Sequence, residues 1–362
     1  MGRSTIIVRG MDGSRGTGQG IPMAPQLPDQ IDAWLSACPD LVRSPLVGMK
    51  EAGLLALRNS YAEIARTKAA LVERTGLFGL AGVWGGPQLV NRFFIAPNAT
   101  DAQRAEWLGR PASVAISEPG VGAHPKHLRT RAEPNEDGFR ITGEKAWASN
   151  AAFAEVIIVF AITSQDPDGR KRYSAFLVPR DTPGLSVRDM PGFHALAPSR
   201  HSTVTLDGCH VPTTGLLGEP GTAYERMALP FRDTEDAVGG YALTGAFRFL
   251  LDRFRRNHIR SDDTALALGA LAALTAVLTD AADAVVTALD SERLGAATPS
   301  LIGTRVLATE MLARAQAFRR EHVPGEETGA DTVLKDIETM LSIARGPRLA
   351  RQMRLADETS PR

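Results

Sequence analysis

The sequence has few cysteines and no metal-site or disulfide pattern among them. Its 362 residues include only Cys38 and Cys209, which lie far apart in the chain. Two such residues make neither a disulfide framework nor the closely spaced pairs of a zinc site. His124 and His127 lie close to each other in the sequence, but no further metal ligands accompany them, so no metal site is predicted. We expect a protein of a reducing compartment and predict a cytoplasmic location.

The sequence also lacks an excess of either charge. Lysine plus arginine number 41, and aspartate plus glutamate number 41, so no overall field attracts nucleic acid or an anionic membrane. The most apolar stretch, 265–278, is shorter than the roughly 20 residues of a membrane helix. The first residues lack the apolar core of a signal peptide. These absences predict a soluble protein with no nucleic-acid partner and no membrane span.

Hydrophobic patterning divides the chain into four parts. Residues 1–27 are rich in Gly, Pro and Ser without periodicity, which predicts a flexible tail. Residues 28–110 carry amphipathic helical patterns. Residues 111–218 hold β-branched and aromatic runs punctuated by Pro and Gly, which predict a small antiparallel barrel or sandwich. Residues 219–362 return to long helical patterns with short breaks, which predict an antiparallel bundle.

Shorter signals locate individual elements. GVWGGPQ at Gly82–Gln88 predicts a break in the first helical pattern. Residues 98–101 supply caps for a short helix that ends at Trp107. The turn Asn135–Gly138 predicts a hairpin leading into a strand at 139–149. Helices in the last part are predicted at 238–255, 262–289, 300–322 and 331–345.

Five segments stand in the order and spacing of one known family. They are ISEPGVG (116–122), GFRITGEKAWASN (138–150), SAFLVPRDTPGL (174–185), VTLDGCHVP (204–212) and LLGEPG (216–221). Through them, and through the order of helices, β unit and bundle, the chain resembles the acyl-CoA dehydrogenase family. The resemblance implies an α+β fold with N-terminal helices, a central antiparallel β-barrel or sandwich and a C-terminal helical bundle.

The resemblance also implies a bound FAD and the residues that would hold it. Ser117 would hydrogen-bond the isoalloxazine, and Gly122 would let the backbone approach the ring or the pyrophosphate. Trp147 would pack on the flavin face, and the Ser149 hydroxyl would reach flavin N5. A flat apolar slot with a few placed donors suits a flavin. The other interpretation is a plain barrel loop with a Ser cap and a core Trp.

The resemblance is incomplete where the family carries its catalytic base. The segment with that glutamate aligns with 344–347, and Arg345, whose pKa exceeds about 12, cannot act as a base near neutral pH. Some members place the base on the first helix of the bundle. Glu235 lies within one position of that site, and Thr234 takes the ungapped position. Acidic residues also favour a helix N-terminus without any chemistry, so both interpretations of Glu235 stay open.

Three functions are compatible with the resemblance. The first is an FAD-dependent oxidoreductase acting on CH–CH groups. It would dehydrogenate an acyl thioester of CoA or acyl carrier protein and pass electrons to an electron-transfer flavoprotein or another acceptor. The second is a flavin enzyme without α-proton abstraction, such as an oxygenase, in which Arg345 would hold an anion. The third is a non-catalytic subunit of a heteromeric dehydrogenase. Wide apolar faces at 262–289 and 300–322 predict a homo-oligomer or a heteromer with a relative.

Overall fold

The computed structural model describes residues 27–359 apart from positions 39, 47, 50, 191 and 194. The tail predicted over 1–27 lies outside the described residues except for its last position. The helices are α1 (Leu27–Ala37), α2 (Tyr61–Thr75), α3 (Phe78–Val90), α4 (Ala96–Asn98), α5 (Asp101–Trp107), α6 (Leu229–Asn257), α7 (Asp262–Asp290), α8 (Thr298–His322), α9 (Thr328–Ser342) and α10 (Arg345–Thr359). The strands are β1 (Ala112–Ala115), β2 (Arg131–Pro134), β3 (Gly138–Ser149), β4 (Val156–Gln165), β5 (Lys171–Pro179), β6 (Leu185–Asp189), β7 (His201–Pro212) and β8 (Leu216–Leu217).

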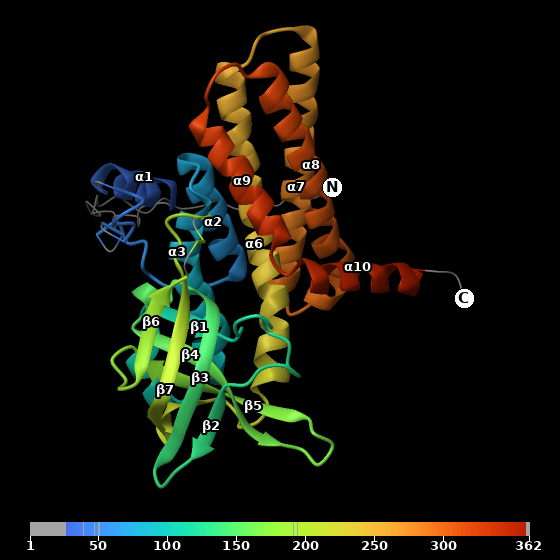
Figure 1. Ribbon diagram of the computed structural model, residues 1–362. Coiled ribbons are helices and arrows are strands. Elements are labelled where there is room, and N and C mark those ends of the chain that lie inside the picture. Colours follow the sequence, from blue (N-terminus) through green and yellow to red (C-terminus); the bar gives the residue numbers. More distant parts are fainter. Residues whose placement is uncertain are drawn as a thin grey trace, which may run out of the picture.

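The elements follow the predicted order of helices, sheet and helical bundle. In Figure 1 the N-terminal helices sit beside the long C-terminal helices, and the sheet lies below them. Helix α6 runs from the sheet into the bundle, and it packs along α2 on the way. The predicted fold class is therefore confirmed, whereas the predicted domain boundaries stay predictions.

The sheet is mixed, which corrects the prediction of an antiparallel β domain. Its strands follow the order β6-β7-β3-β2-β4-β5-β8, and β1 pairs with β4 off this path. Both β1 and β2 run parallel to β4. Between β1 and β4 the chain passes through the β2–β3 hairpin, and such a long crossover is what parallel pairing requires. The hairpin itself is confirmed, with Pro134 opposite Phe139.

Helix α3 runs through the segment in which a break was predicted, so that prediction is wrong. A Cβ at Gly79 would lie 1.7 Å from the carbonyl oxygen of Leu196, and one at Gly82 would lie 3.3 Å from Ser199 Oγ. The missing side chains therefore leave room for Leu196 and Ser199 to pack against the helix. The glycines serve this close approach and do not end the helix. The predicted cap is confirmed, because the Thr100 side chain accepts from the first turn of α5 in a capping box.

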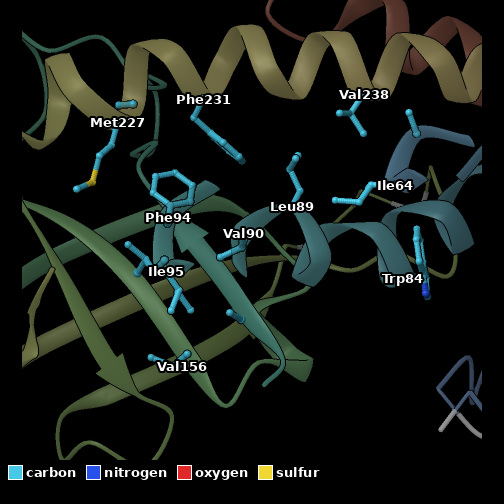
Figure 2. Close-up of a cluster of buried hydrophobic side chains, with 14 of the residues drawn as sticks. Ile64, Trp84, Leu89, Val90, Phe94, Ile95, Val156, Met227, Phe231 and Val238 are labelled. Atoms are coloured by element: carbon cyan, nitrogen blue, oxygen red, sulfur yellow. The ribbon is translucent and has the colours of Figure 1, made fainter. Parts of the chain in front are cut away.

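One apolar core joins the N-terminal helices, the sheet and the start of α6. Figure 2 shows Phe231 of α6 pointing toward Phe94, with Val156 of the sheet below them and Trp84 of α3 to one side. The Phe94 and Phe231 ring centroids lie 4.6 Å apart. This contact fixes the first turns of α6 against the rest of the molecule.

The C-terminal bundle differs from the prediction in two ways. Helix α6 begins nine residues earlier than the predicted 238, and α10 is an additional helix that leaves the bundle at an angle (Figure 1). Helix α7 extends the apolar stretch 265–278 to 29 residues and is, by length and composition alone, able to cross a membrane. Helix α7 also packs against α6 and α8, as a core helix of a bundle would. The predicted absence of a membrane span is not tested by these observations and stays a prediction.

Candidate functional site

The loop that follows β1 is closed on itself and fastened to β3. Backbone hydrogen bonds join Glu118 and Gly122 in both directions, at 2.9 and 3.1 Å. The amide of Ala146 donates to the Ser117 carbonyl at 2.9 Å. Gly122 has φ 59°, and a Cβ there would meet nothing within 4 Å. Its glycine therefore serves the backbone conformation, and the space beside it is open.

A buried ion pair under this loop was missed by the sequence analysis. Glu118 accepts hydrogen bonds from the Arg129 amide at 2.6 Å, the Thr130 amide at 2.9 Å and Lys145 Nζ at 2.9 Å. Burial alone would raise the pKa of Glu118, but the Lys145 charge and the hydrogen bonds lower it overall. Burial lowers the pKa of Lys145 to about 8, although Glu118 opposes the shift. The only signal was the glutamate inside ISEPGVG and the lysine inside GEKAW.

Trp147 presents an aromatic side chain to solvent near the end of β3. It has φ 60° beside a bulge in the β3–β7 pairing, and its side chain is 48% exposed. The Phe193 ring stands edge-on to it with centroids 5.3 Å apart. Two residues further on, Ser149 is also exposed, and its carbonyl accepts the Ser113 hydroxyl at 2.9 Å.

His201 joins this cluster, and no sequence motif singled it out. It lies opposite Ser149 in the β3–β7 pairing. Its ring contacts that of Phe193 at a centroid distance of 4.8 Å. Burial lowers the pKa of His201, which keeps the imidazole neutral, and its Nδ1 atom is buried without a hydrogen-bond partner. Only the pairing of β3 with β7 in the assembled sheet brings His201 to this place.

This cluster fits a planar heteroaromatic group such as a flavin. It combines the exposed indole of Trp147, the hydroxyl of Ser149 and an orphaned imidazole nitrogen at His201. A buried polar atom without a partner is costly, so a ligand that supplies one is favoured there. The structure therefore brings Trp147 and Ser149 together with His201, and it places Ser117 on the neighbouring loop.

Glu235 lies well inside a helical segment. Helical backbone begins at Tyr224 and continues into α6, which puts Glu235 roughly three turns from its start. The stabilising effect of a helix N-terminus on a carboxylate is confined to about the first turn. The helix-start explanation of this residue therefore loses its physical basis.

The environment of Glu235 favours its neutral form more than water does. Burial is the largest cause raising the pKa of Glu235, although its side chain is exposed to solvent. The neighbouring Asp236 charge raises it further, while Lys68 on α2 opposes the shift. Burial lowers the pKa of Lys68, and Glu235 is the charge that opposes this. The two side chains thus form a coupled pair between α2 and α6.

Arg345 stands at the start of α10 and has a different set of neighbours. It lines a cavity between α6, α8 and α10 together with Asp236, Arg305 and Arg348. Neither Glu235 nor Trp147 lines this cavity. Among the described residues, no group of three potential ligands gathers around His124 and His127 or elsewhere.

Part of the sequence is similar to known proteins. Residues 113–209 match the family model described as acyl-CoA dehydrogenase, middle domain. The cyclohexane-1-carbonyl-CoA dehydrogenase of Syntrophus aciditrophicus is 32% identical over 193 residues, which cover 51% of this chain and 48% of its own length. The middle of the chain, residues 113–209, belongs to the acyl-CoA dehydrogenase family. Other relatives in this family include the probable acyl-CoA dehydrogenase YngJ of Bacillus subtilis, 34% identical over 32% of this chain and 30% of its own length.

Solved structures share this fold over most of the chain. Glutaryl-CoA dehydrogenase from Mycobacterium smegmatis superimposes with a TM-score of 0.72 at 20% identity, covering 88% of this chain and 89% of its own. The FAD complex of PigA gives 0.70 at 17% identity, covering 96% and 100%. At such identities the likeness concerns the fold alone. The sequence matches span about half or less of the curated relatives, so the activity of the whole protein is a matter for proposal.

Proposed function

We propose that this chain binds FAD and dehydrogenates an acyl thioester between its α and β carbons. The observation that supports this most is Glu235, an exposed carboxylate on α6 whose pKa is raised. The family resemblance supports this, because some members carry their base on this helix, the first of the C-terminal bundle. A raised pKa moves a carboxylate toward the operating pH, where a general base works best.

FAD, when bound, supplies the two-electron acceptor for the β-hydride. The chain would position it with residues already together at the end of β3. Trp147 offers an apolar face, and the Ser117 and Ser149 hydroxyls can donate to ring heteroatoms. The neutral imidazole of His201 adds one donor or acceptor, according to its tautomer. The Glu118–Lys145 pair holds the loop that carries Ser117 against β3.

Glu235 would take the α-proton of the substrate as its own carboxylate becomes neutral. Lys68 acts against burial at that carboxylate, since its positive charge favours the ionised form. Without Lys68 the pKa of Glu235 would rise further, and less of the base form would exist near neutral pH. The pair therefore sets how much active base is present.

A second candidate is a flavin enzyme without α-proton abstraction. Arg345, whose side chain makes no hydrogen bond or ion pair among the described residues, favours it because a free guanidinium can bind an anionic substrate. A non-catalytic subunit of a heteromeric dehydrogenase is the remaining alternative. An acyl thioester that reduces bound flavin would exclude both.

We also propose an oligomer in the cytoplasm, with an electron-transfer flavoprotein or another acceptor taking the electrons. Only 28% of the most apolar window of α7 is buried within the chain. Leu266 and Val277 on this helix are 73% and 55% exposed. Apolar area of this kind is usually covered by a partner, and a second copy or a relative of this chain would do so.

The visible absorption spectrum of the purified full chain, titrated with FAD, tests the cofactor. We expect a flavin band and quenching of tryptophan fluorescence. The double variant with Trp147→Ala and Ser149→Ala should bind FAD at least tenfold more weakly. Ser164→Ala, an exposed hydroxyl further along β4, is the matched control. Protein that stays colourless with added FAD, alone and with a co-expressed relative, contradicts the proposal.

A further inference from the structure

A cavity in the bundle carries an unusual concentration of arginine. It has a volume of about 240 Å³ and lies between α6, α8, the end of α9 and α10. Arg305, Arg345, Arg348 and Arg351 all line it, against the carboxylates of Asp236 and Glu310. Arg351 is already paired with Asp233 of α6. With that carboxylate counted, the lining still carries one positive charge in excess, in a chain whose overall charge is zero.

The floor of the cavity is a buried carboxylate shared by two arginines. Asp236 accepts from Arg305 Nη2 at 2.7 Å, and Arg348 binds both of its oxygens, at 2.5 and 3.1 Å. Burial alone would raise the pKa of Asp236, but the Arg348 hydrogen bonds and the two positive charges lower it overall. One negative charge between two guanidinium groups leaves positive charge at the floor. Glu310 at the rim is exposed and has no ion-pair partner among the described residues.

Two donors at the cavity have no partner in the described part of the chain. The Nε atom of Arg305 is buried and makes no hydrogen bond. Burial lowers the pKa of Arg305 to about 10, a value at which it is still protonated near neutral pH. The Arg345 side chain is exposed and forms neither an ion pair nor a hydrogen bond among the described residues. A guanidinium fork matches a carboxylate or phosphate group bidentately.

The remaining walls are apolar and open. Ile302 and Val306 of α8 face the cavity together with Leu349 of α10. Val306 is 43% exposed and Leu349 is 47% exposed. Binding sites for small molecules combine such walls with a few convergent polar groups. A volume of about 240 Å³ suits a small ligand.

We infer that this cavity binds a small amphipathic oxyanion, with its head on Arg345 and Arg305 and a short apolar tail against Val306 and Leu349. A carboxylate and a phosphate monoester share the required head-group chemistry. The site is separate from the proposed base. Neighbouring residues on a helix point about 100° apart, and Glu235, next to Asp236, does not line the cavity. The inference therefore does not depend on the proposed dehydrogenation.

A ligand there would also tie α10 to the bundle. Helix α10 packs mainly against α8, and the cavity lies at that contact. Arg345 and Leu349 come from α10, whereas Arg305 and Val306 come from α8. A bound anion would bridge the two helices, and α10 would be protected from local opening.

Isothermal titration of the full chain with four probes tests the inference, at constant ionic strength held by chloride. The probes are hexanoate, acetate, hexyl phosphate and inorganic phosphate. We expect one saturable site, with each hexyl probe binding more tightly than the short anion of the same head group. Hexanoate as the tighter of the two hexyl probes assigns a carboxylate ligand, and hexyl phosphate as the tighter assigns a phosphate monoester.

Variants at the cavity separate this site from binding elsewhere. Arg345→Ala should weaken the binding of the hexyl probe about 10- to 100-fold, and Arg345→Lys should weaken it less. Leu349→Ala should reduce the advantage of hexanoate over acetate. Arg314→Ala, an exposed arginine of α8 outside the lining, should change nothing. Hydrogen exchange should slow in α10 when the probe is bound.

Three results would overturn the inference. They are no binding of any probe at tens of millimolar, unchanged affinity in Arg345→Ala, and binding that leaves exchange in α10 unaltered. Arg345 is exposed and unpaired, so its variants are expected to fold, and circular dichroism verifies this. The flavin spectrum measured on the same samples reports separately on the proposed function, which can fail or hold whatever the anion titration shows.

Discussion

Replacing Lys145 with methionine should destabilise the chain strongly, although the lysine has no assigned chemical role. The Lys145 side chain is fully buried, and Nζ donates to Glu118 at 2.9 Å and to the Ile116 carbonyl at 3.2 Å. Methionine is close to it in volume, so packing changes little. What remains is a buried Glu118 carboxylate without its counter-charge.

The size of the effect follows from that uncompensated charge. Removing one partner of a buried ion pair typically costs about 3–5 kcal/mol. Glu118 keeps its hydrogen bonds from Thr130 and Arg129, which argues for the lower end, about 3 kcal/mol. The double variant Lys145→Met with Glu118→Gln removes both charges and should recover about 1–2 kcal/mol, since contacting residues couple.

Urea unfolding followed by circular dichroism measures these free energies. Lys126→Met, an exposed lysine of the same connection, should stay within about 0.5 kcal/mol of the parent. The loop that carries Ser117 should also loosen in Lys145→Met, so FAD should bind more weakly. A loss below about 1 kcal/mol, or a double variant no more stable than the sum of the singles predicts, would refute the assigned role of the pair.

Two further predictions concern packing and acid stability. Gly245→Ala in α6 should cost about 1–3 kcal/mol, because its Cβ would lie 2.1 Å from the Ala69 carbonyl oxygen on α2. Gly269→Ala in α7, where a Cβ meets nothing within 4 Å, should instead stabilise by up to about 1 kcal/mol; equal effects in urea unfolding would contradict the close α2–α6 contact. The pKa of Asp236 is lowered in the folded chain, so its contribution to stability is fully present above its unfolded value of about 4 and is lost as pH falls through the lower folded pKa. Asp236→Asn should therefore lose less stability between about pH 5 and pH 3 than the parent does, and parallel losses in unfolding titrations would count against this.

The elements that the sequence predicted were those with local signals. Strands such as β4 are continuous apolar runs, and the capping residues Thr100 and Gln103 mark the start of the short helix α5. Both elements could therefore be placed from a few residues. The glycines of α3 misled the analysis because a helix break and a close helix–loop approach use the same residue type. Only the position of Leu196 in space distinguishes them.

The candidate site was predictable only where a family motif carries it. Ser117, Trp147 and Ser149 came from such motifs, and their roles stay predictions. The residues that surround them in the folded chain are distant in sequence, and no local sequence pattern predicts those neighbours. His201 lies opposite Ser149 across a strand pair, and the charge of Lys68 acts on Glu235 from another helix, so both required the assembled chain.

The most direct test of the central claim is substrate-dependent flavin reduction. The FAD-loaded full chain is mixed anaerobically with straight and branched acyl-CoA thioesters in a stopped-flow instrument. We predict bleaching of the flavin band by at least one thioester, with a rate that rises with pH through a midpoint above the ordinary glutamate pKa of about 4.3, because the pKa of Glu235 is raised. Glu235→Gln should keep the flavin and slow the bleaching about 100- to 10,000-fold, while Glu338→Gln, an exposed carboxylate of α9, should not. Bleaching at an unchanged rate in Glu235→Gln would contradict its role as the base, and no bleaching of the parent by any thioester would contradict the dehydrogenase itself.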